Sequence, residues 1–415
     1  LAALQGISPL DPNPSAGTTD SSTSLARSVG AEEVLSIRAV CPGSESCRIE
    51  IQRFSGGSDR VLWAEALDAP PSEPKLFAEA VSAAIRRGYA RRPLLDHVPA
   101  MSISEADYRH HLELRKAALD HSRPLAELLA ELEDLRRKAP EFVEVAALEA
   151  AVARQQFERT GDAAALAQGL EALRSAEATA PDDARLARVR FDLELRAERY
   201  DEAAKTLDHL AAIEPGTAIV FSLRGRLAER RGDPTAAIEW MQKAVERQPS
   251  WQLLLTLANL EYRTGKLEAA RGHLRELLDR APGNPEGIKA WAQIELLSGD
   301  PAQAVALYGQ LDRDRRDPQT LGNEGVALLL LRRPQEAEAA FRRALALAPQ
   351  DPGTLLNLAD ALTLSGRTEE ARAIYREVVA RTEAAPQELL TTRAQALAHG
   401  GEPRRAVETI VQALR

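Results

Sequence analysis

The stretch from residue 317 to residue 349, DPQTLGNEGVALLLLRRPQEAEAAFRRALALAP, decides the fold of this chain. Its pattern predicts two helices with a break near residues 332–334. On the second helix, Ala337, Phe341 and Ala344 have i, i+4 and i+7 spacing, which places them on one face. Two small residues beside one aromatic residue are typical of a helix that packs closely against its partner.

The same pattern recurs along most of the chain. Each unit ends at a proline, opens its second helix with an alanine, and has a large apolar residue four positions after that alanine. Glycines occupy the turns, and Gly325 permits close packing at a cost in helix propensity. The prolines are Pro215, Pro249, Pro282 and Pro349; the alanines are Ala203, Ala237, Ala270, Ala304, Ala337, Ala371 and Ala406; the apolar residues are Leu207, Met241, Leu274, Tyr308, Phe341, Tyr375 and Ile410; the turn glycines are Gly232, Gly265, Gly299, Gly366 and Gly401.

This ladder resembles the tetratricopeptide repeat, whose period is about 34 residues. Two looser helix pairs, at residues 105–138 and 142–179, precede the seven matching units, so we expect about nine pairs. Such pairs bury their apolar faces only by stacking. The resemblance therefore implies a mostly α fold, a right-handed α-solenoid over residues 99–415, whose first helices line a concave groove.

Residues 1–98 have a different pattern, which predicts a small α/β domain. Alternating apolar and polar residues indicate a three-stranded antiparallel meander. An amphipathic helix follows, with Phe77, Val81 and Ile85 on one stripe. The predicted strands are residues 34–40, 47–54 and 61–67, and the predicted helices are residues 1–6, 24–29 and 76–89.

The runs GAEEVLSIRAV, CRIEIQRF, DRVLWAEAL and LFAEAVSAAI in this region resemble a small α/β domain of bacterial signalling proteins. That domain precedes tetratricopeptide arrays in some receptor-like Ser/Thr kinases, winged-helix regulators and nucleotide cyclases. The family closes its third strand with a Leu-Trp pair, as Leu62 and Trp63 would here, but its first strand is missing. The chain also begins at Leu1 without a signal-peptide pattern. We therefore expect a fragment of a longer protein, with an effector domain upstream.

Bulk composition argues against two classes of function. The net charge is −9 and the pI is about 5.5, whereas a general nucleic-acid binder usually carries a basic face. The longest apolar run, residues 326–331, is far shorter than the ~18 residues of a membrane helix. We expect neither a nucleic-acid partner nor a membrane contact, except through a missing upstream segment.

Cys41 and Cys47 flank the sequence PGSES between the first two predicted strands. A disulfide between them would close the hairpin and indicate an oxidising compartment. The alternative is two unrelated thiols. A metal site is not expected, because no second cysteine pair or nearby histidine supplies more ligands. A disulfide would favour the periplasmic part of a membrane protein, and free thiols would favour the cytoplasm.

No catalytic motif is present. The sequence contains no GxxxxGK[ST], HRD, DFG, HExxH or GxSxG pattern. His110 and His111 could bind a metal together with His121, although solvated surface histidines are the simpler interpretation. Hydrolase or transferase activity in the α/β domain would need a nucleophile and a base, and we recognise no such pair. We therefore expect no enzyme activity and no cofactor.

The groove implied by the resemblance is the candidate binding site. Its hydrogen-bond donors suit the carbonyls or carboxylates of an extended peptide. Leu296, Leu297, Val326, Leu329 and Leu330 add apolar surface, which either holds a partner's side chain or packs against the next repeat. The candidate residues are Arg226, Arg230, Asn259, Tyr262, Arg263, Lys289, Gln293, Asn323, Leu329 and Asn357.

Some tetratricopeptide domains clamp a terminal carboxylate in this groove. Lys289 and Asn323 resemble residues of that clamp. Gln293, Gly353 and Asn357 replace its other members, so we do not expect a clamp of this kind.

These observations lead to a non-enzymatic sensor and protein-interaction region of a bacterial signalling protein, with a receptor-like Ser/Thr kinase as the leading candidate. A peptide or protein partner would bind in the groove and bias the upstream domain. The region could also form a homodimer. The alternatives are the sensory half of a winged-helix transcription regulator and a free-standing tetratricopeptide assembly scaffold.

Overall fold

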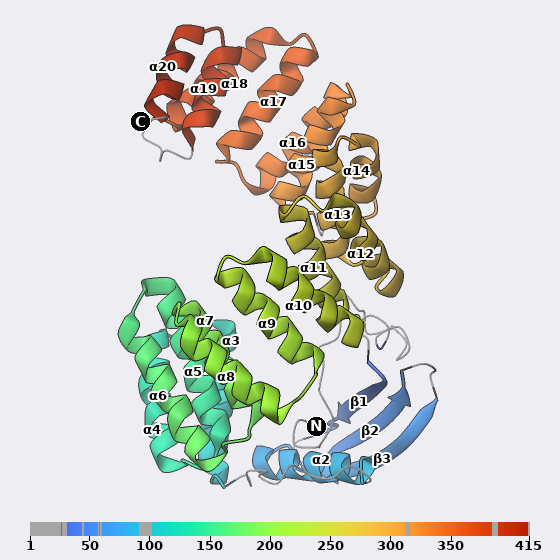
Figure 1. The fold of residues 1–415 in the computed structure, drawn as a ribbon, viewed down its shortest axis with the longest axis vertical. Helices are drawn as coiled ribbons and strands as arrows, with labels where there is room; N and C mark the ends of the chain where they lie inside the picture. Colours follow the sequence, from blue (N-terminus) through green and yellow to red (C-terminus); the bar gives the residue numbers. More distant parts are fainter. Residues whose placement is uncertain are drawn as a thin grey trace. The chain divides into compact units, whose positions relative to one another are not determined.

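The computed structural model describes residues 26, 31–43, 45–56, 58, 60–90, 102–311, 316–383 and 389–413. This part of the chain contains three strands and nineteen helices (Figure 1). Contacts between residues divide the chain into two compact units, Leu1–Leu260 and Glu261–Arg415. Within the described ranges, no helix is long and apolar enough to cross a lipid bilayer.

The first unit begins with a three-stranded antiparallel sheet in the order β1-β2-β3, as predicted. One face of the sheet packs against α2, where Ile49 and Ile51 of β2 are fully buried beside Ala84. Of the two short helices predicted before the sheet, residues 1–6 lie outside the described residues, and only Ala26 of residues 24–29 lies within them. The elements are β1 (Glu33–Val40), β2 (Cys47–Ser55), β3 (Val61–Ala69) and α2 (Pro74–Gly88).

Cys41 and Cys47 form a disulfide in the connection between β1 and β2. Cys47 is also the first residue of β2, and its side chain is fully buried. The bond therefore joins the two ends of the hairpin connection next to the sheet core.

The sheet contacts the helical array through α2 and α3. The Glu105 carboxylate of α3 accepts a hydrogen bond from the backbone N–H of Lys75 at 3.2 Å, and Arg109 donates to the carbonyl of Ser72. The predicted change from sheet to repeats, near residue 98, falls in residues 91–101, outside the part of the chain that the structure describes.

In the described part of the chain, eighteen helices follow α2 and form the nine pairs that the sequence predicts (Figure 1). Odd-numbered helices are the first of each pair and even-numbered helices the second. The first unit holds α3 (Glu105–Asp120), α4 (Leu125–Lys138), α5 (Val143–Thr160), α6 (Ala163–Thr179), α7 (Ala184–Arg196), α8 (Tyr200–Ile213), α9 (Ala218–Arg230) and α10 (Pro234–Arg247). The boundary between the units falls inside α11 (Trp251–Arg263). The second unit holds α12 (Leu267–Arg280), α13 (Pro285–Ser298), α14 (Pro301–Tyr308), α15 (Pro318–Leu330), α16 (Pro334–Leu347), α17 (Pro352–Leu364), α18 (Thr368–Arg381), α19 (Leu390–His399) and α20 (Pro403–Ala413).

The repeating alanines and large apolar residues form the core between helices. All seven alanines are at most 4% exposed, and six of the seven large residues are at most 2% exposed. Ile410 of α20 differs, because its side chain is 48% exposed. A Cβ at Gly325 would collide with the ring of Phe341, so the predicted close approach of α15 and α16 requires glycine there.

The turn after the first helix of each pair contains one residue with a positive φ. Six pairs place glycine there, from Gly161 (φ 69°) to Gly401 (φ 94°). At the equivalent positions, His121 adopts φ 53°, and Glu198 and Arg332 adopt φ 58°. The helix break predicted near residues 332–334 therefore consists of Arg332 in the left-handed conformation, Arg333, and Pro334, which opens α16.

Candidate functional site

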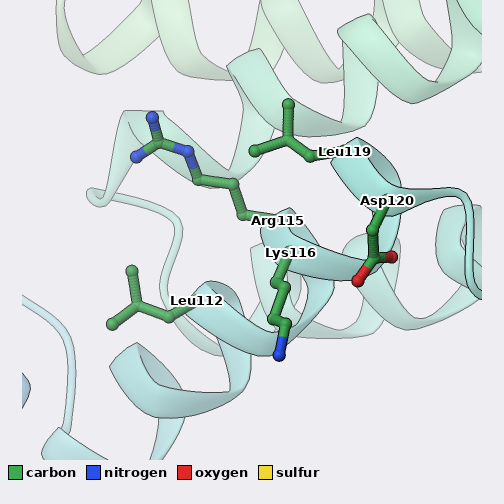
Figure 2. A pocket seen from close by; sticks show the side chains of 5 residues that line it. All are labelled: Leu112, Arg115, Lys116, Leu119 and Asp120. Carbon is green, nitrogen blue, oxygen red and sulfur yellow. The ribbon is translucent and has the colours of Figure 1, made fainter.

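Among the described residues, no three His, Cys, Asp or Glu side chains are grouped as a metal site would require. A hollow on α3 is lined by Leu112, Arg115, Lys116, Leu119 and Asp120 (Figure 2). All five come from one helix, and Leu119 is 72% exposed. Binding pockets surround most of a ligand's surface, whereas a single helix provides only one wall.

The sequence predicted that His111 lies on the surface, but the structure buries it. It is 4% exposed and packs edge-on against the Phe142 ring, with 5.3 Å between ring centroids. Burial, together with the smaller effect of the Arg115 charge, lowers the pKa of His111 to about 4. Because the neutral ring is part of the aromatic contact between α3 and the start of α5, it has a packing role.

Four glutamates on first helices are buried, but each has a partner inside the fold. Their carboxylates accept hydrogen bonds from arginine, histidine, threonine or tryptophan side chains. Each therefore joins its helix to a neighbour and is not a free acid or base. The pairs are Glu149 with Arg136 at 2.8 Å, Glu194 with Thr206 at 2.7 Å, Glu261 with His273 at 2.7 Å, and Glu295 with Arg271 at 2.8 Å and Trp291 at 2.7 Å.

The candidate residues of the first unit lie on α9 and α11. Arg226 is bound to Asp192 of α7 at 2.7 Å, so one of its donors is used within the array. Arg230, the last residue of α9, is exposed and has no ion-pair partner among the described residues. Asn259 of α11 is also exposed.

The candidate donors of the second unit differ in how accessible they are. Arg263 and Gln293 are exposed; Tyr262, Asn323 and Asn357 are half-buried. Lys289 binds Asp317 at 2.8 Å and Glu286 at 3.4 Å. Burial opposes the charged form of Lys289, but Asp317 and Glu286 outweigh it and raise the pKa of the lysine.

Asp317 also caps the start of α15, accepting a hydrogen bond from the backbone N–H of Thr320 at 2.7 Å. Lys289 therefore ties α13 to the cap of the next first helix. A partner would have to compete with this contact to use the lysine.

The apolar residues of this region separate into two groups. Val326 and Leu329 pack against the core around Phe341, and Leu296 packs against the core around Tyr308. Leu297 and Leu330 are 63% and 58% exposed. The two interpretations of this apolar surface therefore apply to different residues: Leu329 serves packing, and its neighbour Leu330 is available to a partner.

Leu364 extends this exposed set to a third repeat. It is 50% exposed and, like Leu330, is the last residue of its helix. Leu297, Leu330 and Leu364 occupy the same place on α13, α15 and α17, and successive first helices are in contact. We call these three residues the leucine column. Leu364 was not predicted from the sequence, although spacings of 33 and 34 residues connect the three leucines.

The equivalent positions earlier in the chain are arginines. Arg196, Arg230 and Arg263 end α7, α9 and α11, as Leu330 and Leu364 end α15 and α17. The same place in the repeat therefore carries a cation in three successive repeats and a leucine in the next three.

Family models agree with this helix arrangement. A tetratricopeptide-repeat model matches residues 188–250, 222–285 and 289–352, and a second tetratricopeptide-repeat model matches residues 328–396. The chain carries tetratricopeptide repeats. Proteins built from these repeats mediate protein–protein interaction through extended surfaces. No curated protein matches the chain.

The chain is similar to solved structures of tetratricopeptide proteins. One is the C-terminal part of a repeat protein from Cytophaga hutchinsonii, with 14% identity, a TM-score of 0.45, and coverage of 54% of this chain and 93% of that one. Another, from Parabacteroides merdae, has 17% identity, a TM-score of 0.47, and coverage of 56% and 92%. A third is YrrB, described as having an unusual peptide-binding site, with 18% identity, a TM-score of 0.34, and coverage of 43% and 92%.

Proposed function

We propose that this tetratricopeptide array is a non-enzymatic interaction module and that its leucine column binds an apolar segment of a protein partner. One observation carries the proposal: three leucines at the same place in successive repeats are 50–63% exposed. Large apolar side chains grouped at the surface mark interaction sites. Leucines elsewhere on these first helices, such as Leu328 and Leu362, are buried in the core.

The column has enough apolar surface to contribute to binding. Fully burying one leucine contributes about 1.5–3 kcal/mol, so covering three exposed ones contributes several kcal/mol before ordering costs. Gln293, Asn323 and Asn357 lie on the same three helices. Their amides are suited to hydrogen-bond the backbone of a bound segment.

Leu330→Glu tests this proposal, and Leu347→Glu is a matched control. Leu330 is 58% exposed on a first helix and Leu347 is 60% exposed on the second helix of the same pair. Partners are captured from the source cells with the parent chain, and their affinities are measured for each variant. We expect Leu330→Glu to weaken binding at least about tenfold, the loss of one buried leucine contact, and Leu347→Glu to have little effect. Equal binding by both variants would falsify the proposal.

For the whole protein, we propose that this region belongs to a bacterial signalling protein, with a receptor-like Ser/Thr kinase as the leading candidate, and that it lies outside the cytoplasm. The resemblance of the α/β domain supports the signalling role. The disulfide of Cys41 and Cys47 supports the location outside the cytoplasm, because such bonds persist in oxidising compartments. The reading frame upstream of Leu1 tests the kinase role, and a reading frame that encodes a winged-helix domain would overturn it.

The mass of alkylated, unreduced protein from native cells tests the location outside the cytoplasm. Free thiols in that protein would contradict this location.

A further inference from the structure

Five charged side chains form one connected network on three successive first helices of the first unit. Asp192 of α7 lies at the centre and is bound to Arg226 of α9 at 2.7 Å, with Arg154 of α5 and Arg196 of α7 each 3.5 Å away. Arg196 also binds Glu158 of α5 at 2.5 Å. With Arg230, one helical turn beyond Arg226, we call the four arginines the arginine cluster.

The cluster has more positive than negative charge. Burial opposes the ionisation of Asp192, but Arg226, Arg196 and Arg154 outweigh it and hold the pKa of the Asp192 carboxyl below its usual value. Two carboxylates, Asp192 and Glu158, pair with three arginines, and Arg230 adds a fourth positive charge, so the cluster has two more positive than negative charges on a chain of net charge −9.

The arginines remain accessible to a further anion. The side chains of Arg196 and Arg226 are each 39% exposed, and Arg230 is exposed at the end of α9 without an ion-pair partner in the described residues. A guanidinium group has five N–H donors, so one carboxylate contact leaves others free. Asp192 and Glu158 fix the positions of Arg196 and Arg226 in advance, which lowers the entropy cost of binding.

We propose that the arginine cluster binds an acidic, Asp- or Glu-rich segment of a protein partner. This inference rests on the proposed function, since it names a second class of segment that the interaction module recognises. Carboxylates match the excess positive charge and can bind guanidinium groups in pairs. A nucleic acid fits less well, because it would bring many phosphates against a chain of strongly negative net charge.

Arg230→Glu tests the inference, and Arg247→Glu is its control. Both arginines are exposed at the last position of their helices, α9 and α10, and neither has an ion-pair partner among the described residues, but only Arg230 lies on a first helix. The probe is a fluorescein-labelled peptide of alternating Glu and Ser residues, and binding to the full chain is followed by fluorescence anisotropy. We expect Arg230→Glu to weaken binding about tenfold, and Arg247→Glu to leave it nearly unchanged. We also expect added salt to weaken binding.

Three results would overturn the inference: no binding of the acidic peptide to the parent chain, equal weakening by both variants, or displacement of the peptide by an equimolar single-stranded oligonucleotide. Leu330→Glu, measured with the same peptide, separates this inference from the proposed function. If Leu330→Glu loses the native partner while Arg230→Glu retains both the partner and the peptide, the inference fails and the proposed function stands.

Discussion

Arg332 holds a backbone conformation that glycine adopts in six other helix pairs of the array. A residue with a Cβ is less stable than glycine by about 1–2 kcal/mol in the left-handed region. Arg332 is nevertheless exposed, and its backbone N–H donates to the carbonyl of Leu329 at 3.0 Å, so the turn closes in the usual way. The strain therefore lies in one dihedral angle and not in a lost contact.

Replacing Arg332 with glycine should relieve that strain. We expect Arg332→Gly to raise the free energy of unfolding by about 1 kcal/mol, the left-handed penalty less the added entropy of glycine in the unfolded chain. The reciprocal change, Gly366→Arg, should lower it by a similar amount, because no atom lies within 4 Å of a Cβ built there and only the φ of 79° opposes the side chain. Urea unfolding followed by circular dichroism measures both; a change of the same sign in the two variants would contradict the explanation.

Single residues also show where the sequence was informative and where it was not. The ladder of alanines and large apolar residues predicted which side chains fill the core, because residues that recur at the repeat period lie on the same face of each helix. The period could not tell Leu329 from Leu330, since adjacent residues on a helix differ by about 100° and a small change of packing decides which is buried. Nor could it show that Lys289 binds Asp317, because a pair 28 residues apart depends on how successive helices pack.

At the scale of an element, α12 is joined to the end of α11 by a titratable contact. His273 Nδ1 lies 2.7 Å from a carboxylate oxygen of Glu261, whose side chain is 1% exposed. The bond to Glu261 raises the pKa of His273 against the effect of burial, and the charge of Glu276 adds to the increase. Protonated His273 thus neutralises a carboxylate that has little contact with water.

This contact predicts a stability that falls with rising pH. Because the pKa of His273 is raised in the folded state, its stabilisation is complete below the unfolded value of about 6.5 and is lost as the pH rises through the folded value. We expect the thermal midpoint of the parent chain to decrease over that interval and His273→Gln to remove the decrease. An NMR titration of the imidazole gives the pKa directly, and Glu261→Gln should lower it. A pKa unaffected by Glu261→Gln would rule out this explanation.

Prediction of whole elements from the sequence was accurate for the strands, for α2 and for the nine helix pairs, since most of them carry a strong period. It was less accurate for the face that a helix buries. His111 was expected to be a solvated surface histidine, yet α3 turns His111 toward Phe142. The face that a helix presents to a neighbour depends on that neighbour's side chains, which no single helix pattern contains.

At the scale of the molecule, the same position of the repeat carries a cationic side chain in some repeats and an apolar one in others. The last positions of α7, α9 and α11 are arginines, and the equivalent positions of α13, α15 and α17 are the leucine column. Stacked repeats each keep their own core contacts, so surface positions can change without disturbing the ladder beneath them. This explains why the sequence predicted the ladder of buried residues better than the exposed surface: the buried residue types recur through the whole array, whereas the residue type at an exposed position changes along it.

The sheet and the array have separate cores, which predicts that they lose structure separately. The cluster of Ile49, Ile51, Ala69 and Ala84 contains side chains from the sheet and α2 only. Closing a short loop by a disulfide contributes about 2 kcal/mol by restricting the unfolded chain. Reduction of Cys41–Cys47, or the double change Cys41→Ser and Cys47→Ser, should therefore destabilise the sheet by about that amount while the repeats are unaffected. Hydrogen–deuterium exchange should become faster in residues 33–69 and stay constant in residues 184–311, and the reductant should have no effect on the serine variant. Faster exchange throughout both regions would mean that the sheet and the repeats unfold as one cooperative body.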